Sequence, residues 1–118
     1  MNNKQRRYAF SEASSYSDRD AYISDLASSS MWGDGPEDEI PADRLQELGH
    51  LWDAANLPMR ELLAPCGTMV DAAERFCIPY RTIQDWCAGL HPCTQYVRLL
   101  IADALRYDTA QTDSSISR

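Results

Sequence analysis

The stretch "FCIPYRTIQDWCAG", residues 76–89, joins the end of one helix-like segment to the start of another through Cys-Ile-Pro. Pro79 suits the first turn of a helix, where the amide hydrogen that proline lacks would have no partner. Ile83 and Trp86 are three residues apart, so they share one face of that helix. Gly89 suits the left-handed position after its last turn. The stretch therefore predicts a short helix with one apolar face in a core.

Helical spacing continues on both sides of this stretch. Thr68 is placed to cap a helix over "MVDAAERFC", and Pro58 opens a short helix before it. The inward positions that the spacing predicts for these two helices are Met59, Leu62, Leu63, Met69, Ala72, Ala73 and Phe76. A last helix over 92–107 has an apolar stripe of Tyr96, Val97, Leu100, Ile101 and Leu105. Residues 57–107 are therefore expected to form one helical domain.

The first half of the chain has its own helical pattern, over residues 17–56. A helix capped by Asp18 is expected over 17–32, and Trp32 is expected to anchor it in the core. Residues 33–41, with two glycines and four acids, predict a loop. A second helix follows Pro41 and ends near Asn56, with Leu45, Leu48, Leu51, Trp52 and Ala55 facing inward. We interpret 17–56 as an acidic helical N-terminal extension packed on the core.

The two ends of the chain lack a clear apolar pattern. Residues 1–16 are polar and rich in serine, which predicts a flexible N-terminus. Residues 108–118 have almost nothing to bury, so a disordered tail is expected there. The predicted fold class is all-α, a small helical bundle of about six helices.

Composition and charge narrow the class of protein. The chain has 118 residues, 44% hydrophobic and 25% charged, as in soluble globular proteins. It lacks an apolar run long enough for a membrane helix, and its first residues lack the apolar stretch of a secretory signal. We therefore expect a cytoplasmic protein that does not enter a membrane.

The net charge of −7 is distributed unevenly. Residues 1–56 hold eleven acidic and five basic side chains, a net charge of −6. Residues 57–107 hold five of each and are neutral. A neutral second half permits contact with nucleic acid, whereas the acidic first half suits a basic protein surface.

Neither a metal site nor an enzyme is predicted. The four cysteines, Cys66, Cys77, Cys87 and Cys93, form no Cys-x-x-Cys pair and are expected to be reduced structural thiols. The sequence lacks a phosphate-binding glycine loop and an arrangement of nucleophile and base, and its carboxylates gather in a loop. No cofactor and no catalytic residue is therefore assigned.

The segments "AERFCIPYRTIQDWCAG" and "YVRLLIADAL" resemble the lambda-repressor-like family, the Xre/Cro-type helix-turn-helix domains. The resemblance covers about residues 58–107. It rests on Ala73, Phe76, Ile78, Pro79, Thr82, Ile83, Trp86 and Gly89. It implies a DNA-binding domain in which the helix over 79–88 enters the major groove.

Under this resemblance the outward face of 79–88 would contact DNA. Arg81 has the fork that fits guanine O6 and N7, and Gln84 has the paired donor and acceptor that fit adenine. Thr68, at a helix start, would contact a phosphate, and Thr82 or Tyr80 would add another such contact. A plainer interpretation also applies, in which Arg81 only pairs with Asp85 four residues later and Gln84 is solvated surface.

Four positions depart from the family pattern. Met69 replaces a glutamine, Cys77 replaces a turn glycine and Cys87 replaces a glutamate, while Asp85 adds an anion near the groove face.

Two hypotheses for the function therefore stand. The first is a sequence-specific regulator that binds double-stranded DNA as a homodimer. The alternative is a degenerate helix-turn-helix that binds a protein partner, through the acidic first half, and no longer binds DNA.

Overall fold

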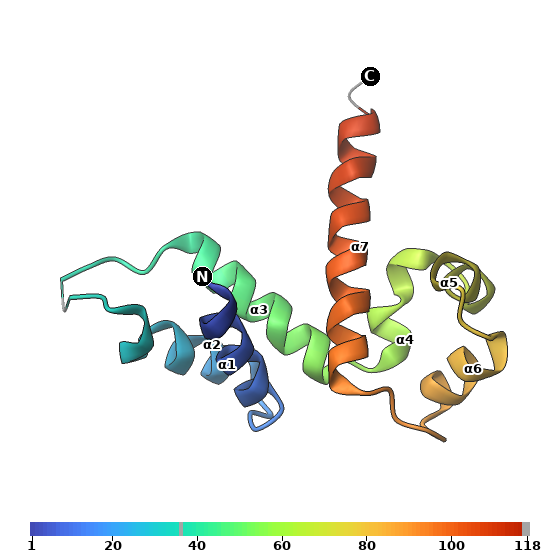
Figure 1. The fold of residues 1–118 in the computed structure, drawn as a ribbon, viewed down its shortest axis with the longest axis horizontal. Helices are drawn as coiled ribbons and strands as arrows, with labels where there is room; N and C mark the ends of the chain where they lie inside the picture. The colour runs from blue at the N-terminus through green and yellow to red at the C-terminus, as the bar shows by residue number, and fades with distance from the viewer. Residues whose placement is uncertain (36, 117–118) are drawn as a thin grey trace. The chain divides into compact units, whose positions relative to one another are not determined.

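Helices account for the regular structure in both halves of the chain (Figure 1). The structure is a computed structural model that describes residues 1–35 and 37–116, with side chains over 1–35 and 37–106. Within those residues there is no strand, which confirms the predicted all-α class. The chain divides into two units, Met1–Asn56 and Leu57–Arg118.

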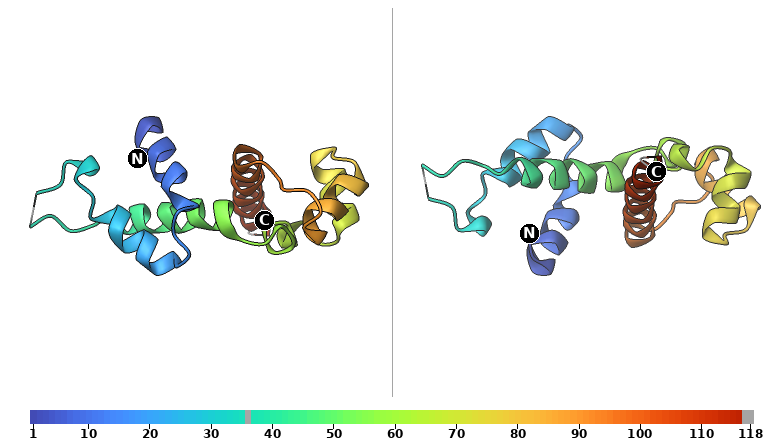
Figure 2. Two further views of the ribbon diagram at one scale, coloured as in Figure 1. Left: turned by 90° about the horizontal axis from the view of Figure 1, so that it is seen from below. Right: turned by 90° about the horizontal axis from the view of Figure 1, so that it is seen from above.

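The first unit contains α1 (Asn3–Ala13), α2 (Arg19–Ala27), the short 3-10 helix η1 (Ser30–Trp32) and α3 (Ala42–Asn56). Both α1 and α2 pack against α3 (Figures 1 and 2). Tyr22 is fully buried in this core, and its hydroxyl donates a 2.6 Å hydrogen bond to the carbonyl of Ala9. The other buried apolar residues are Ala9, Ala13, Leu26, Ala27, Leu48, Leu51, Ala54 and Ala55.

The prediction of a flexible segment over 1–16 is wrong for most of its length, because α1 occupies residues 3–13. Asn2 caps this helix: its side chain accepts from the amide of Gln5, whose side chain accepts from the amide of Asn2. Ala9 and Ala13 are fully buried against the rest of the unit. The apolar face of α1 was missed because it consists of alanines, which contribute little to a hydrophobic pattern.

Trp32 is half-buried and held from two sides. Its indole N–H donates to the carbonyl of Leu26 at 2.7 Å, and the Arg44 guanidinium lies 4.3 Å from its ring centroid. Arg44 also pairs with Asp34, and this hydrogen bond holds the pKa of the Asp34 carboxyl below its ordinary value. Trp32 thus joins the end of α2 to α3, but it is half-buried and does not belong to the buried core in which it was expected.

The predicted inward face of α3 is confirmed at the centre of the helix but not at its start, and the predicted end of the helix is confirmed. Leu48 and Leu51 are buried as expected, whereas Leu45 is exposed. Asn56 is the last residue of α3, and its side-chain amide donates to the carbonyl of Ala13 at 3.0 Å. This bond ties the end of α3 to the end of α1.

The second unit contains α4 (Met59–Leu62), the 3-10 helix η2 (Ala64–Cys66), α5 (Met69–Phe76), α6 (Tyr80–Ala88) and α7 (Gln95–Ile116). Helix α6 packs against α4 and α5. Ile83 of α6 is fully buried, and Met59, Leu62 and Leu63 are buried as predicted. The remaining buried apolar residues are Ala72, Ala73, Cys93, Ile101, Ala102 and Leu105.

Helix α7 differs from its prediction in length and in rotation. It continues to Ile116, so residues 108–116 are helical rather than disordered, and 117–118 lie outside the described residues. Ile101 and Leu105 are buried as expected, but Tyr96 and Leu100 are exposed. Arg98 is buried instead, and it donates to the carbonyl of Leu57.

Candidate functional site

Helix α5 begins with a capping box that involves Thr68 and Asp71. The Thr68 hydroxyl oxygen accepts from the amide of Asp71 at 3.1 Å. The Asp71 carboxylate accepts from the Thr68 amide at 2.8 Å, and this bond holds its pKa below the ordinary value. The predicted cap at Thr68 is confirmed, and the threonine is exposed at the start of α5.

The turn between α5 and α6 consists of Cys77, Ile78 and Pro79. Cys77 has the left-handed conformation, with φ 55° and ψ 40°. Its amide donates to the carbonyl of Ala73, as does the amide of Ile78 at 3.0 Å. The backbone thus needs a positive φ at the position where the resembled family has glycine.

Cys77→Gly is expected to stabilise the protein by about 0.5–1 kcal/mol, because glycine adopts this conformation without the clash of a Cβ. The greater freedom of glycine in the unfolded chain offsets part of the gain. Urea unfolding measures the difference. Cys77→Ala is the control, since it removes the thiol and keeps the Cβ. Equal stability of the two variants would contradict the expected gain.

Helix α6 ends with a left-handed glycine, as predicted. Gly89 has φ 76°, its amide donates to the carbonyl of Trp86, and the amide of Leu90 donates to the carbonyl of Asp85 at 2.9 Å. These are the two hydrogen bonds of the Schellman motif. The Leu90 side chain is 68% exposed.

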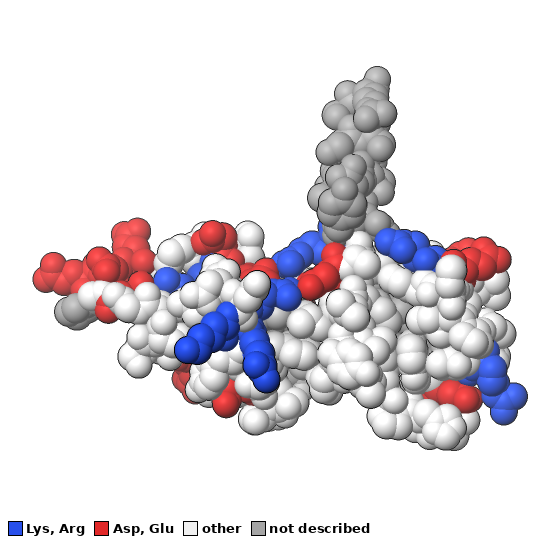
Figure 3. All heavy atoms as spheres, viewed as in Figure 1, with Lys and Arg blue, Asp and Glu red and all other residues white. Residues whose placement is uncertain are grey.

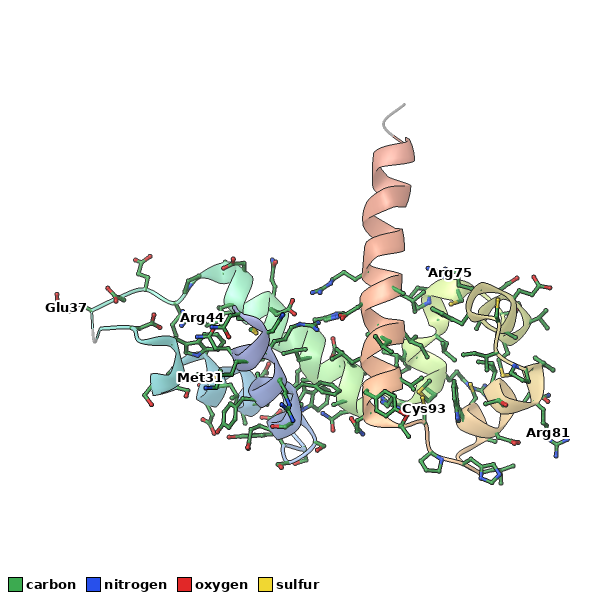
Figure 4. The ribbon with its side chains drawn as sticks, viewed as in Figure 1. Met31, Glu37, Arg44, Arg75, Arg81 and Cys93 are labelled. Carbon is green, nitrogen blue, oxygen red and sulfur yellow. The ribbon has the colours of Figure 1, made fainter. Side chains whose placement is uncertain are left out.

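The outward face of α6 carries three of the five predicted contact residues. Since Ile83 is buried, Tyr80, Arg81 and Gln84 face solvent. The Arg81 side chain is 83% exposed and points away from the helix (Figure 4). Thr82 belongs to the same helix but is half-buried, and Thr68 lies on the other helix, at the start of α5.

The charges around this face are balanced. Arg81 Nε lies 3.4 Å from Asp85 Oδ1, so the predicted ion pair forms, and His91 Nε2 lies 4.0 Å from Asp85 Oδ2. An ion pair this exposed contributes at most about 1 kcal/mol, so it does not commit Arg81 to Asp85. On the side of the second unit that Figure 3 shows, acidic and basic atoms alternate and most of the surface is uncharged.

A small cavity of about 50 Å³ lies at the start of α5. Its lining includes Gly67, Thr68 and Met69, together with Arg60 of α4 and Cys87 of α6. The sequence analysis did not assign a role to Arg60, because a single exposed arginine on a four-residue helix has no pattern that marks it as a functional residue. Only the tertiary fold brings Arg60 to the cavity that the start of α5 also lines.

Within the described residues, no three His, Cys, Asp or Glu side chains are grouped as a metal site would require. All four cysteines are free thiols, and burial raises the pKa of Cys93. In the part of the chain that the structure describes, no helix has both the length and the apolar character to cross a membrane.

Fold and site together define an all-helical chain whose second unit exposes one side of α6 after a three-residue turn. Comparison with family models, with curated proteins and with solved structures found no match.

Proposed function

We propose that the protein is a sequence-specific DNA-binding protein, a transcriptional regulator that places α6 in the major groove. One observation carries the proposal: Ile83 fixes one side of α6 in the core, so Tyr80, Arg81 and Gln84 stand together in solvent. The resemblance to the Xre/Cro-type family supports the same role for this helix. The protein would act in the cytoplasm, without catalysis or a cofactor.

The dimensions of α6 suit this role. An α-helix with its side chains is about 10–12 Å across, which fits the roughly 12 Å width of the major groove. Tyr80, Arg81 and Gln84 fall within the first five residues of the helix. In helix-turn-helix complexes it is the start of the second helix that reaches base edges.

The specific contacts are assigned to Arg81 and Gln84. The exposed Arg81 guanidinium would leave Asp85 for guanine, and Gln84 would pair with adenine. Asp85 repels phosphates, but its side chain is only 19% exposed and pairs with Arg81. The anion therefore lowers affinity without blocking the face.

Phosphate contacts are assigned to the start of α5. The Thr68 hydroxyl donates to Asp71 Oδ2 at 2.9 Å and would turn from this carboxylate to a phosphate oxygen, next to the first amides of the helix. Arg60, which lines the same cavity, adds a positive charge. Tyr80 and Thr82 would supply further hydroxyls at the start of α6. These contacts position the protein and carry no sequence preference.

A selection from random duplexes, performed with the purified chain at two salt concentrations, tests the function. We expect enrichment of a palindrome with half-sites about 34 Å apart, because two copies double the contacts that one small unit makes. Affinity should fall steeply as salt rises, since phosphate contacts release counterions. Sequences no more frequent after selection than before it would refute the proposal.

Arg81→Ala is expected to cost about 1–3 kcal/mol of binding to the selected sequence and to relax preference at one base pair. Its thermal stability should be unchanged, because the side chain is 83% exposed. Arg7→Ala, at an exposed arginine of α1, removes the same charge and is the control. Fluorescence anisotropy with matched and mismatched duplexes measures both. Equal losses of affinity in the two variants would mean that Arg81 acts only through its charge and does not contact a specific base.

A second candidate function is a protein-interaction module without DNA binding. The exposed apolar side chains of Val70 and Leu90 near α5 and α6, and the acidic loop around Glu37 in Figure 4, favour it. The same selection separates the two candidates, because this one expects no enriched duplex at either salt concentration.

A further inference from the structure

A cavity of about 500 Å³ lies in the first unit, between α1 and the residues around η1. This volume is within the range of about 300–1,000 Å³ that small-molecule sites occupy. The residues that line the cavity are Asn2, Lys4, Gln5, Tyr8, Ser29, Ser30 and Met31. The proposed DNA contacts all belong to the second unit, so they do not account for this cavity.

Hydrogen bonds hold the two walls of the cavity in place. The Gln5 side-chain amide donates to the carbonyl of Met31 at 3.2 Å, which joins α1 to η1 (Figure 4). The Ser29 hydroxyl oxygen accepts from the amide of Met31 at 3.3 Å and so caps η1. On the other wall, the capping box between Asn2 and Gln5 fixes the first turn of α1. The cavity is therefore formed in advance, as small-molecule sites usually are.

The cavity has one uncompensated positive charge. Among the described residues that line it, Lys4 is the only one with a charged side chain. Lys4 is exposed, and in the part of the chain that the structure describes it has no ion-pair or hydrogen-bond partner. Figure 3 shows basic atoms at the surface over α1. An anion in the cavity can therefore pair with Lys4 without displacing a group of the protein.

Apolar surface lies next to this charge. Tyr8 is 51% exposed and follows Lys4 by four residues, so the two side chains share one face of α1. Met31 belongs to the other wall, and the thioether of methionine makes favourable contacts with aromatic rings. Aromatic rings also pair favourably with one another, as a ligand ring would with Tyr8. The cavity thus suits a molecule with a negative end and an aromatic body.

A neighbouring cavity of about 550 Å³, which shares Gln5, does not offer the same chemistry. Its two arginines are already paired with carboxylates of the protein, Arg6 with Glu47 and Arg44 with Asp34. An anion that entered this second cavity would have to displace one of these carboxylates. The cavity beside Lys4 imposes no such cost, so it is the better anion site.

We propose that the cavity beside Lys4 binds a small aromatic acid, a single carboxylate attached to a ring. The carboxylate pairs with Lys4, and the ring lies between Tyr8 and Met31. One negative charge fits better than a phosphate dianion, because residues 1–56 carry a net charge of −6 and one lysine offsets only one charge. This site goes beyond the proposed function and does not depend on it, since its residues all belong to the first unit.

An NMR titration of the isotope-labelled full chain with phenylacetate tests the site. Two further probes separate the contributions: phenylacetamide has the same ring without the charge, and inorganic phosphate has charge without a ring. We expect phenylacetate to shift the amide signals of residues 2–8 and 29–31 and to saturate them at millimolar concentrations. The other two probes should bind at least about tenfold more weakly. Equal affinity of phenylacetate and either of the other probes would overturn the inference.

Lys4→Gln should weaken phenylacetate binding by at least about tenfold, because it removes the charge that pairs with the carboxylate. Arg7→Gln is the matched control, since Arg7 is also an exposed cation of α1 but does not line the cavity. Both positions are exposed, so thermal unfolding should show that neither variant loses the fold. Equal weakening by the two variants would contradict the site, as would the absence of a saturable shift in the unmodified chain.

Discussion

Ile83→Ala should lower the free energy of unfolding by about 3–4 kcal/mol, a large share of what a small domain has. Ile83 is fully buried in the second unit, on the helix that carries Arg81 and Gln84. Removing its side chain takes apolar contact area from the core and leaves a cavity beneath α6. Urea unfolding followed by circular dichroism measures the loss. DNA binding should fall in the same variant, because α6 would lose its fixed orientation.

Ile83→Val is the control for this prediction. It removes one methylene group and should cost only about 0.5–1.5 kcal/mol. A small and equal effect of both variants would mean that α6 does not depend on Ile83 for its position. The orientation of Arg81 and Gln84 would then need another explanation.

Tyr22→Ala is expected to cost about 3–5 kcal/mol and to open the first unit. Tyr22 is fully buried, and its hydroxyl joins α2 to the carbonyl of Ala9 in α1. The substitution removes both the aromatic packing and this hydrogen bond. Hydrogen exchange should show faster exchange in α1, α2 and α3, which identifies where stability is lost.

Tyr22→Phe separates the contribution of the hydrogen bond from that of the aromatic packing. It keeps the ring and loses the hydrogen bond, for which we expect about 1–2 kcal/mol. Burial raises the pKa of Tyr22 well above its ordinary value of 10.0, so the fold favours the neutral hydroxyl. Stability from this group is therefore complete below pH 10 and declines as pH rises above it, a decline absent from Tyr22→Phe. Equal stability of Tyr22→Phe and wild type at neutral pH would contradict the role of the bond.

The elements that local chemistry specifies were predictable. The caps at Asp18 and Thr68, the left-handed Gly89 and the burial of Ile83 all follow from rules about a few neighbouring residues. For the candidate site, the sequence was enough to place Tyr80, Arg81 and Gln84 on the outward face of one helix. These features depend on backbone hydrogen bonding and on helical periodicity, which are local.

The predictions that were wrong concern features that depend on packing between secondary-structure elements. Helix α1 buries alanines, whose pattern is too weak to find before α3 is in place beside them. Tyr96 and Leu100 were assigned to the core because they are apolar, but the unit buries the opposite side of α7 and encloses Arg98. An amphipathic pattern shows that a helix has an apolar face, and it does not show which of two such faces its own unit will cover.

The sequence by itself determined that the chain is helical, where several helices begin and end, and that one side of 79–88 would be polar. Tertiary structure alone decided that Arg60 lies beside the start of α5 and that Tyr96 and Leu100 remain uncovered. The physical reason is range: hydrogen bonds and helical spacing act within about one turn, whereas burial depends on residues that are distant in the chain.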